Sequence, residues 1–253
     1  MPILEVSNCI KSFGGLIAVK DLNMTLNQGD LYGLIGPNGA GKTTIFNLIT
    51  GVYEPDEGTI QLEGKQIQGS KPSSIASLGI SRTFQNIRLF QSMTVLENVK
   101  LARHMRRKQR LADAVLRTQN LHREEEEIEA DALALLKIFK LDSVAFELAL
   151  NLPYGSQRRL EIARALATKP KLLLLDEPAA GMNPLESLEL MRLIRWIRDE
   201  FKITILLVEH NMKVVMGVCE KIQVIDYGET IALGSPKEIQ DDPHVIEAYL
   251  GGA

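Results

Sequence analysis

The segment Gly36-Pro-Asn-Gly-Ala-Gly41-Lys42-Thr43 constrains this chain most, because it fits the phosphate-binding loop pattern G-x-x-x-x-G-K-[ST]. It lies between an apolar run at 31–35, which predicts a buried strand, and a helical pattern that begins near Lys42. Glycines in such a loop let backbone N–H groups turn toward phosphates, and the positive end of the following helix faces them. The alternative, a glycine turn without a ligand, would not require this strand–loop–helix context.

The loop therefore predicts a site for ATP and Mg²⁺. We expect Lys42 to reach the β- and γ-phosphates and the hydroxyl of Thr43 to bind Mg²⁺. The expected nucleotide contacts in this segment are Gly36, Pro37, Asn38, Gly39, Ala40, Gly41, Lys42, Thr43 and Thr44.

A second motif is the leucine run 172–175, which ends in Asp176 and Glu177. Paired carboxylates at the carboxyl end of a buried strand lie where α/β sheets bind ligands. We expect Asp176 to hold Mg²⁺, through water, and Glu177 to orient or deprotonate the attacking water. Two acidic residues that end a strand are commonly structural when they stand alone. Behind a phosphate loop they predict nucleotide hydrolysis.

Apolar runs of strand length alternate with helical patterns, which predicts an α/β fold with a buried sheet. Further strands are expected at 203–208 and 222–225. A helix is expected at 185–201, where apolar residues recur at helical spacing, namely Leu188, Met191, Leu193, Ile194 and Ile197. Pro184 suits the first turn of that helix. Capping boxes at Thr94 with Glu97 and at Ser235 with Glu238 predict two more helix starts.

The shorter alternating segments at 4–26 and 59–62 predict antiparallel strands. Residues 94–168 are helical and more polar. We therefore expect one domain over residues 1–253. In it, 1–93 and 169–253 form a nucleotide-binding core with an antiparallel β subdomain, and 94–168 form an inserted α-helical subdomain.

Composition excludes several classes. A formal net charge of −3 argues against a nucleic-acid binder. The two cysteines, Cys9 and Cys219, suggest neither a disulfide framework nor a metal site and fit a reducing cytosol. The amino terminus does not read as a signal peptide, and the longest apolar runs are of strand length. A membrane-spanning part, if this chain needs one, is expected from other chains.

Gln85 lies between the two motifs, and His210 follows the apolar run at 203–208. Each residue alone is more often structural or simply exposed than functional. With the phosphate loop and the carboxylates, however, the order of elements resembles that of ATP-binding cassette subunits along the whole length. The resemblance implies that Gln85 senses Mg²⁺ and a membrane partner and that His210 contacts the γ-phosphate. It also implies that Phe13 stacks on adenine and that Val19 contacts the nucleotide.

The segment 152–166 resembles the signature loop of this family and the helix after it. In the family this loop caps ATP held by the opposite subunit, which implies nucleotide contacts from Tyr154, Gly155 and Ser156. The usual L-S-G-G-Q is altered here, because Pro153, Tyr154 and Ser156 replace serine, glycine and glutamine. Proline offers neither a hydroxyl nor an N–H, so we predict weaker capping of the partner's nucleotide. Equal nucleotide affinity at the two sites of a closed heterodimer would contradict this.

A further departure is Asn183, which stands where the family usually has aspartate. Asparagine forms hydrogen bonds but carries no charge. Whether two subunits communicate through this position therefore stays an open question at the level of the sequence.

Within the family, the segments 81–90, 93–98, 208–217 and 245–251 and the polar insertion at 103–127 resemble ATPase subunits of branched-chain amino acid importers. This resemblance implies a second ATPase chain, with a homodimer as the alternative for the isolated chain. It also implies two membrane permeases, an external binding protein for leucine, isoleucine or valine, and a place on the cytoplasmic face of the inner membrane.

Other interpretations stay open from the sequence. Cassettes for urea, short amides or lipopolysaccharide could carry much the same residues, because no residue here is expected to touch the cargo. A cassette ATPase that does not serve a transporter, or a nucleotide-dependent module without turnover, are further alternatives. The basic stretch 103–110 and the acidic block 124–127 are expected to be solvated helix faces of opposite charge, with contact to anionic lipid as the alternative for the basic one.

Overall fold

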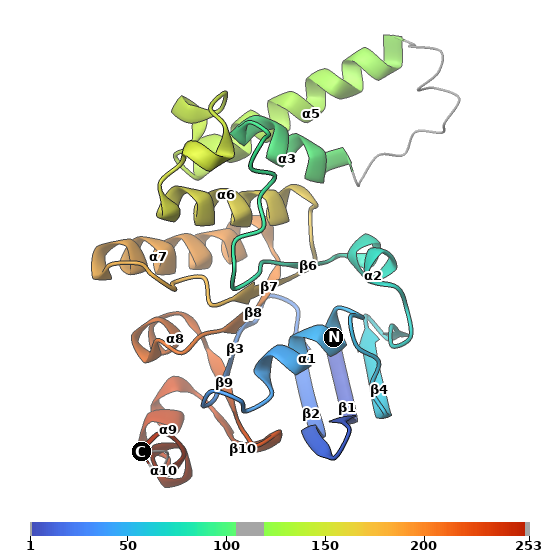
Figure 1. The fold of residues 1–253 in the computed structure, drawn as a ribbon, viewed down its shortest axis with the longest axis vertical. Helices are drawn as coiled ribbons and strands as arrows, with labels where there is room; N and C mark the ends of the chain where they lie inside the picture. The colour runs from blue at the N-terminus through green and yellow to red at the C-terminus, as the bar shows by residue number, and fades with distance from the viewer. Residues whose placement is uncertain (1, 105–118, 251–253) are drawn as a thin grey trace. The chain divides into compact units, whose positions relative to one another are not determined.

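The computed structural model describes residues 2–104 and 119–250 (Figure 1). The chain divides into two compact units, one bounded by Met1–Arg82 and Lys171–Ala253 and the other by Thr83–Pro170. Within the described ranges, no helix is both long and apolar enough to cross a membrane. The predicted subdomain boundaries at 94 and 168 stay a prediction.

The first unit is built on a six-stranded sheet with strand order β10-β9-β3-β8-β7-β6. All neighbouring strands are parallel except β10, which runs antiparallel to β9. Three central strands are buried at every residue, which explains why their sequences are continuous apolar runs. The strands are β3 (Leu31–Ile35), β6 (Ile80–Arg82), β7 (Leu172–Asp176), β8 (Thr204–Val208), β9 (Lys221–Asp226) and β10 (Glu229–Gly234).

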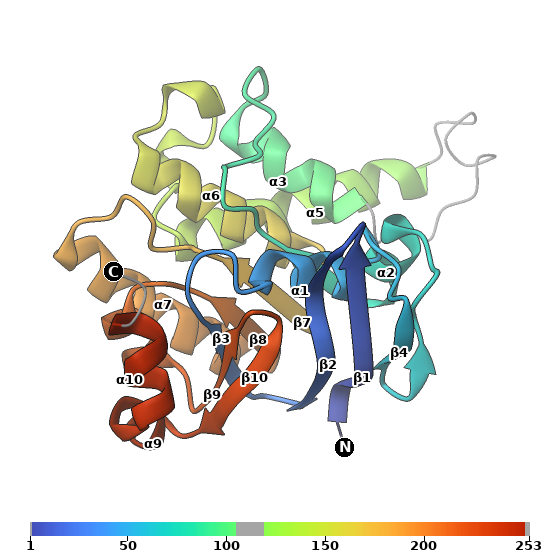
Figure 2. The same ribbon diagram turned by 60° about the horizontal axis from the view of Figure 1, so that its bottom comes forward.

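A second, four-stranded antiparallel sheet belongs to the same unit and has the order β2-β1-β4-β5. Figure 2 shows β1, β2 and β4 side by side. One hydrophobic core joins the apolar face of this antiparallel sheet to the helix α1 (Lys42–Ile49). The core also includes residues of the larger sheet, such as Tyr32 and Leu174. The strands are β1 (Pro2–Phe13), β2 (Leu16–Asn27), β4 (Glu57–Leu62) and β5 (Lys65–Gln66). The predicted α/β core and the predicted antiparallel strands are confirmed.

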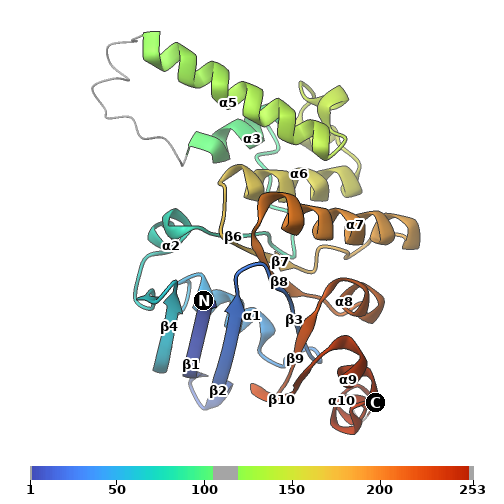
Figure 3. The ribbon, with the colours of Figure 1, turned by 180° about the vertical axis from the view of Figure 1, so that it is seen from behind.

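The helices α7 (Pro184–Phe201) and α8 (Met212–Val218) lie on the side of the large sheet opposite to α1 (Figures 1 and 3). Asn183 caps α7 with a full capping box, and Pro184 occupies its first turn as predicted. The buried face of α7 is Ser187, Leu190, Ile194 and Ile197, whereas Leu188 is half exposed. The predicted helix at 185–201 is confirmed.

Three shorter helices complete the first unit. They are α2 (Pro72–Leu78), α9 (Pro236–Asp241) and α10 (Pro243–Leu250). The predicted capping box of Ser235 with Glu238 starts α9 and is confirmed. Both α9 and α10 pack against β10.

The second unit is helical. In it, α3 (Val95–His104) packs against both α5 (Gln119–Ile138) and α6 (Tyr154–Ala167), with short 3₁₀ turns at Asp142–Val144 and Ala149–Asn151. The predicted capping box of Thr94 with Glu97 precedes α3 and is confirmed.

Opposite charges on α3 and α5 face each other. Lys100 pairs with Glu129 at 2.6 Å, and Arg103 pairs with Asp131 at 2.9 Å. Residues 105–110 of the basic stretch lie outside the described residues, as do 105–118 of the polar insertion and Gly251.

Candidate functional site

The loop between β3 and α1 has a backbone that only glycine fits at two positions. Gly36 has a φ of 155°, and a Cβ there would lie 2.0 Å from the carbonyl oxygen of Ile225. Gly41 has a φ of 106°, and its Cβ would lie 2.4 Å from the carbonyl oxygen of Ala18. Gly41 is also the N-cap of α1, so no side chain caps the first turn of that helix. Its N–H donors therefore suit an anion such as a phosphate.

Lys42 folds back over this loop. Its Nζ donates to the carbonyl oxygens of Gly36 at 2.7 Å and Pro37 at 2.8 Å, and its side chain is buried. Burial lowers the pKa of Lys42, while the nearby carboxylates of Glu177 and Asp176 raise it. The ammonium group of Lys42 thus lies near both carboxylates that the sequence analysis singled out. The neighbouring Thr43 is exposed, and a hydroxyl and a carboxylate are the hard oxygen ligands that Mg²⁺ prefers.

The two carboxylates lie at the carboxyl end of β7, as predicted. Asp176 is its last residue and accepts a hydrogen bond from Nη2 of Arg82 at 2.8 Å. Glu177 has a left-handed backbone with a φ of 47°, and its N–H donates to the carbonyl oxygen of Val208 at 2.8 Å. A strained non-glycine backbone of this kind is held by its surroundings and is frequent at functional sites.

His210 follows β8, the neighbour of β7 in the sheet. Its Nδ1 lies 3.5 Å from Oε2 of Glu177. The His210 side chain is 58% exposed and that of Glu177 is 17% exposed, so the pair can meet a ligand from outside. The first unit therefore brings together the phosphate loop, Asp176, Glu177 and His210.

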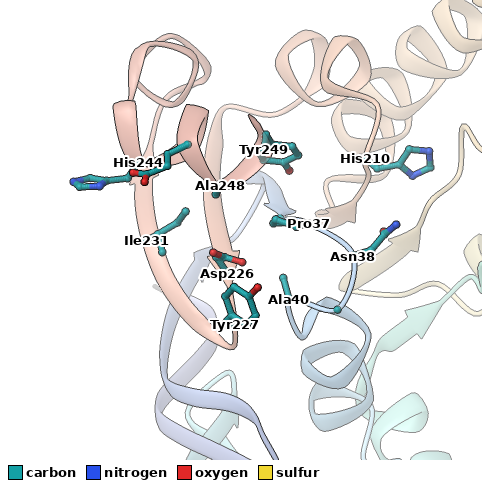
Figure 4. Close-up of a pocket in the computed structure, with 13 residues that line it drawn as sticks. Pro37, Asn38, Ala40, His210, Asp226, Tyr227, Ile231, His244, Ala248 and Tyr249 are labelled. Carbon is teal, nitrogen blue, oxygen red and sulfur yellow. The ribbon is translucent and has the colours of Figure 1, made fainter. Parts of the chain in front are cut away.

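A cavity of ≈ 1070 Å³ opens beside the phosphate loop (Figure 4). Pro37 and Asn38 line it together with His210, the turn between β9 and β10, and α10. Tyr249 of α10 lines the same cavity as Gly36. Burial raises the pKa of Tyr249, and the backbone N–H of Gly36 lowers it. The carboxyl-terminal helix thus borders the cavity beside the start of the loop.

The two predicted adenine contacts lie on the smaller sheet. Phe13 is 41% exposed, and its ring meets that of Tyr53 edge-on with centroids 5.0 Å apart. Val19 is fully buried within β2. The partly exposed ring of Phe13, which the ammonium group of Lys11 approaches to 5.6 Å, is suited to stacking, whereas Val19 presents no side-chain surface in this conformation.

The remaining predicted residues lie in the second unit. Gln85 is exposed, and its backbone carbonyl accepts a hydrogen bond from Nη2 of Arg158 at 2.7 Å. Arg158 is fully buried and also donates to the carbonyl of Phe84 and to Glu161. Both Arg158 and Glu161 belong to α6, so this helix holds the loop that carries Gln85.

The same helix begins in the altered signature segment. Pro153 is its N-cap and provides no side-chain hydrogen bond. Tyr154 is 46% exposed, while Gly155 and Ser156 are half-buried.

Comparison with known proteins identifies the family. The sequence profile described as "ABC transporter" matches residues 19–180, which span the phosphate loop, Gln85 and both carboxylates. The chain belongs to the ABC transporter family. A second profile, described as "Branched-chain amino acid ATP-binding cassette transporter", matches residues 229–253.

Curated relatives of this ABC chain extend over its whole length. It is 46% identical to the "High-affinity branched-chain amino acid transport ATP-binding protein LivG" of Escherichia coli, covering 100% of this chain and 99% of the relative. It is also 46% identical to BraF of Pseudomonas aeruginosa, which carries the same description and coverage. The "Lipopolysaccharide export system ATP-binding protein LptB" of Escherichia coli is 34% identical, with 99% and 98% covered.

Solved structures of ABC cassettes share the fold. The crystal structure of an ATP-binding cassette in its ADP conformation has a TM-score of 0.85 and 33% identity, with 99% of both chains covered. A dimeric cassette in a post-hydrolysis state, bound to ADP and phosphate, has a TM-score of 0.78 and 25% identity, with 92% of this chain and 98% of that chain covered. The predicted fold class, an ABC-type phosphate-loop core with antiparallel strands and a helical part, is confirmed.

Several contacts around the candidate site of the ABC cassette escaped the sequence argument. Arg82 and Asp176 are separated in sequence by the whole helical unit, so no local pattern links them. The hydrogen bond of Arg158 to the Gln85 loop is equally remote. The role of Asn183 as the cap of α7 could have been found, since Glu186 completes a capping box three residues later.

Proposed function

We propose that this chain hydrolyses ATP in the presence of Mg²⁺ and thereby powers uptake of branched-chain amino acids through partner permeases. One observation supports the proposed hydrolysis most directly. The carboxylate of Glu177 lies 3.5 Å from the imidazole of His210. Its negative charge also raises the pKa of Lys42 in the phosphate loop. A base, a hydrogen-bond donor and a cation at one edge of the sheet are groups that can support phosphoryl transfer to water.

The binding roles follow from the chemistry of each group. Lys42 and the backbone N–H groups from Gly36 to Thr44 would bind the phosphates. Thr43, Asp176 and Gln85 would hold Mg²⁺, which when bound neutralises charge on the phosphate oxygens. Phe13 would stack on adenine, with Val19 beside it.

In the chemical step, Glu177 would accept a proton from the attacking water. The water oxygen forms a bond to the γ-phosphorus, and the bond from that phosphorus to the bridging oxygen breaks. ADP and inorganic phosphate result. His210 would donate a hydrogen bond to the γ-phosphate, and Tyr154, Gly155 and Ser156 would cap the nucleotide of a partner cassette.

Sequence similarity supports branched-chain amino acids as the cargo. The relatives named for branched-chain amino acid transport are 46% identical over essentially the whole chain, and the carboxyl-terminal profile carries the same description. The relative named for lipopolysaccharide export is less similar, at 34% identity, yet also covers the whole chain. A different cargo is therefore the second candidate.

The proposed assembly contains a second cassette, two membrane permeases and an external binding protein, on the cytoplasmic face of the inner membrane. A solved relative at 25% identity is dimeric, which supports pairing of cassettes. A heterodimer is the proposed form in the transporter, and a homodimer is the alternative for the isolated chain.

Uptake of labelled leucine at low external concentration tests the proposal, in cells that lack other leucine importers. The native gene is compared with Lys42→Ala and with Lys20→Ala, a lysine on β2 that pairs with Glu229 at the surface. Loss of uptake with Lys42→Ala alone, at equal protein abundance, supports the proposal. Unchanged uptake would mean that the cargo is a different molecule.

A further inference from the structure

The carboxylate of Glu209 is fully buried, although glutamate is usually exposed. It lies between β8 and His210, and three backbone N–H groups face it. Oε1 accepts from Ala179 at 2.7 Å, and Oε2 accepts from His210 at 3.2 Å and Asn211 at 3.3 Å. Burial raises the pKa of Glu209, while these donors and the nearby imidazole of His210 lower it. The buried carboxylate thus has both oxygens hydrogen-bonded, and the donors belong to two different loops.

These two loops carry the candidate reacting groups. Ala179 comes two residues after Glu177, on the loop that follows β7, whereas His210 and Asn211 follow β8. The strands themselves pair only as far as Asp176 and Val208, with one more hydrogen bond from the N–H of Glu177 to Val208. Beyond that point the Glu209 carboxylate joins the two loops by accepting backbone N–H groups from both of them.

We propose that Glu209 is a positioning residue, whose carboxylate clamps the loop after Glu177 to the loop of His210 and so fixes the separation of these two side chains. This inference rests on the proposed hydrolysis and deepens it. Glu209 does not touch the nucleotide in this scheme. It acts through Glu177 and His210, whose side chains lie 3.5 Å apart.

Glu209→Gln is the sharpest variant, because it keeps the size of the side chain but has one carbonyl oxygen instead of two. Either the bond from Ala179 or those from His210 and Asn211 must then face an NH₂ group, which cannot accept them. Small misplacements of catalytic groups commonly cost up to about 100-fold in rate. We therefore expect kcat for ATP hydrolysis to fall roughly 10- to 100-fold. The dissociation constant of ATP should stay within about twofold, because Lys42 and the phosphate loop are untouched.

The matched control is Thr204→Val, at the other end of the same strand. Thr204 is also fully buried, and its hydroxyl accepts from the N–H of Gly29 and donates to the carbonyl of Asn27. Its loss should lower the unfolding temperature while leaving kcat unchanged. If Thr204→Val lowers kcat as much as Glu209→Gln does, the effect is one of general stability and the proposal is wrong.

A double-mutant cycle distinguishes positioning from an independent role. ATP hydrolysis is measured in the complex with the membrane partners for the wild type, Glu209→Gln, His210→Ala and the double variant. Once His210 is gone, its separation from Glu177 no longer matters, so Glu209→Gln should change the rate by less than about twofold. An equal loss in both backgrounds would overturn the proposal.

Two further results keep the test decisive. If Glu209→Gln does not fold, Glu209→Asp takes its place, because it keeps the charge but is one methylene too short to span both loops. If Glu177→Gln and His210→Ala hydrolyse ATP at the wild-type rate, the proposed function itself fails. If those two are slow while Glu209→Gln is normal, only the positioning role fails.

Discussion

Nη2 of Arg82 donates to Oδ2 of Asp176 over 2.8 Å, and the two side chains are only 8% and 7% exposed. The same guanidinium donates to Oδ1 of Asn47 from Nη1 and lies over the ring of Phe46. Asp176 is therefore held by β6, the strand next to β7, before any ligand arrives. Removing one partner of a buried pair leaves the other charge without compensation.

Arg82→Met should accordingly lower the free energy of unfolding by roughly 3 to 5 kcal/mol. Urea denaturation of the purified chain measures this value. Lys171→Met is the matched control, because its pair with Glu63 is about half exposed and should contribute less than about 1 kcal/mol. If the two variants lose the same small amount, the Arg82–Asp176 pair does not stabilise the fold as we infer.

Glu177→Gln should retain ATP but slow its hydrolysis by roughly 100- to 10,000-fold, the usual contribution of a general base. The amide cannot accept the proton of the attacking water, whereas Lys42 and the loop still bind the phosphates. ATP hydrolysis and ATP binding are measured side by side in the complex with the membrane partners. Glu63→Gln, an exposed carboxylate elsewhere in the same unit, should change neither. Normal turnover in Glu177→Gln would exclude it as the base.

Lys42→Ala should weaken ATP binding roughly 10- to 100-fold, since a hydrogen bond to a charged group contributes about 1.5 to 3 kcal/mol. The variant also loses the two hydrogen bonds that Nζ makes to the carbonyls of Gly36 and Pro37, so the loop is less well ordered. Titration with a fluorescent ATP analogue gives the affinity. Lys20→Ala, on the surface of β2, should bind as the wild type does, and an equal effect of both changes would contradict the role of Lys42.

Much of this fold could be predicted because its signals are local. The buried strands are continuous apolar runs, and the turn chemistry of Gly36 and Gly41 is visible in the motif itself. Capping boxes such as Ser235 with Glu238 need only four residues of sequence. Asp176 and Glu177 followed from the same reasoning, since α/β sheets bind ligands at the carboxyl ends of their strands, whereas His210 was expected only from the resemblance to cassette subunits.

The contacts that could not be predicted depend on register and burial. Arg82 meets Asp176 only because β6 pairs with β7 so that Arg82 lies opposite Leu174. Glu209 reads in the sequence as an ordinary polar residue after a strand, yet the fold buries it completely. Leu188 of α7 fits the helical spacing of apolar residues, yet the fold leaves it exposed while Ser187 and Leu190 are buried. Such features need the tertiary structure.

The two cysteines give a prediction that depends on burial alone. Cys9 lies in β1 and Cys219 follows α8, and both thiols are buried and free. Burial raises the pKa of Cys9 to about 11 and that of Cys219 to about 12, so at pH 8 almost no thiolate forms in the folded protein. Because the thiolate is the reactive form, a pKa raised above its ordinary value slows alkylation until the chain unfolds.

Native protein should therefore resist iodoacetamide at pH 8, while the chain in concentrated urea should take up two labels. Mass spectrometry after matched exposure times counts the labels. Even at pH 10 the native sample should label more slowly than the unfolded chain, since both pKa values stay above that pH and most of each thiol remains protonated. Rapid labelling of one native cysteine would mean that its strand or helix opens far more readily than the packing around it implies, because burial is the largest cause of both shifts.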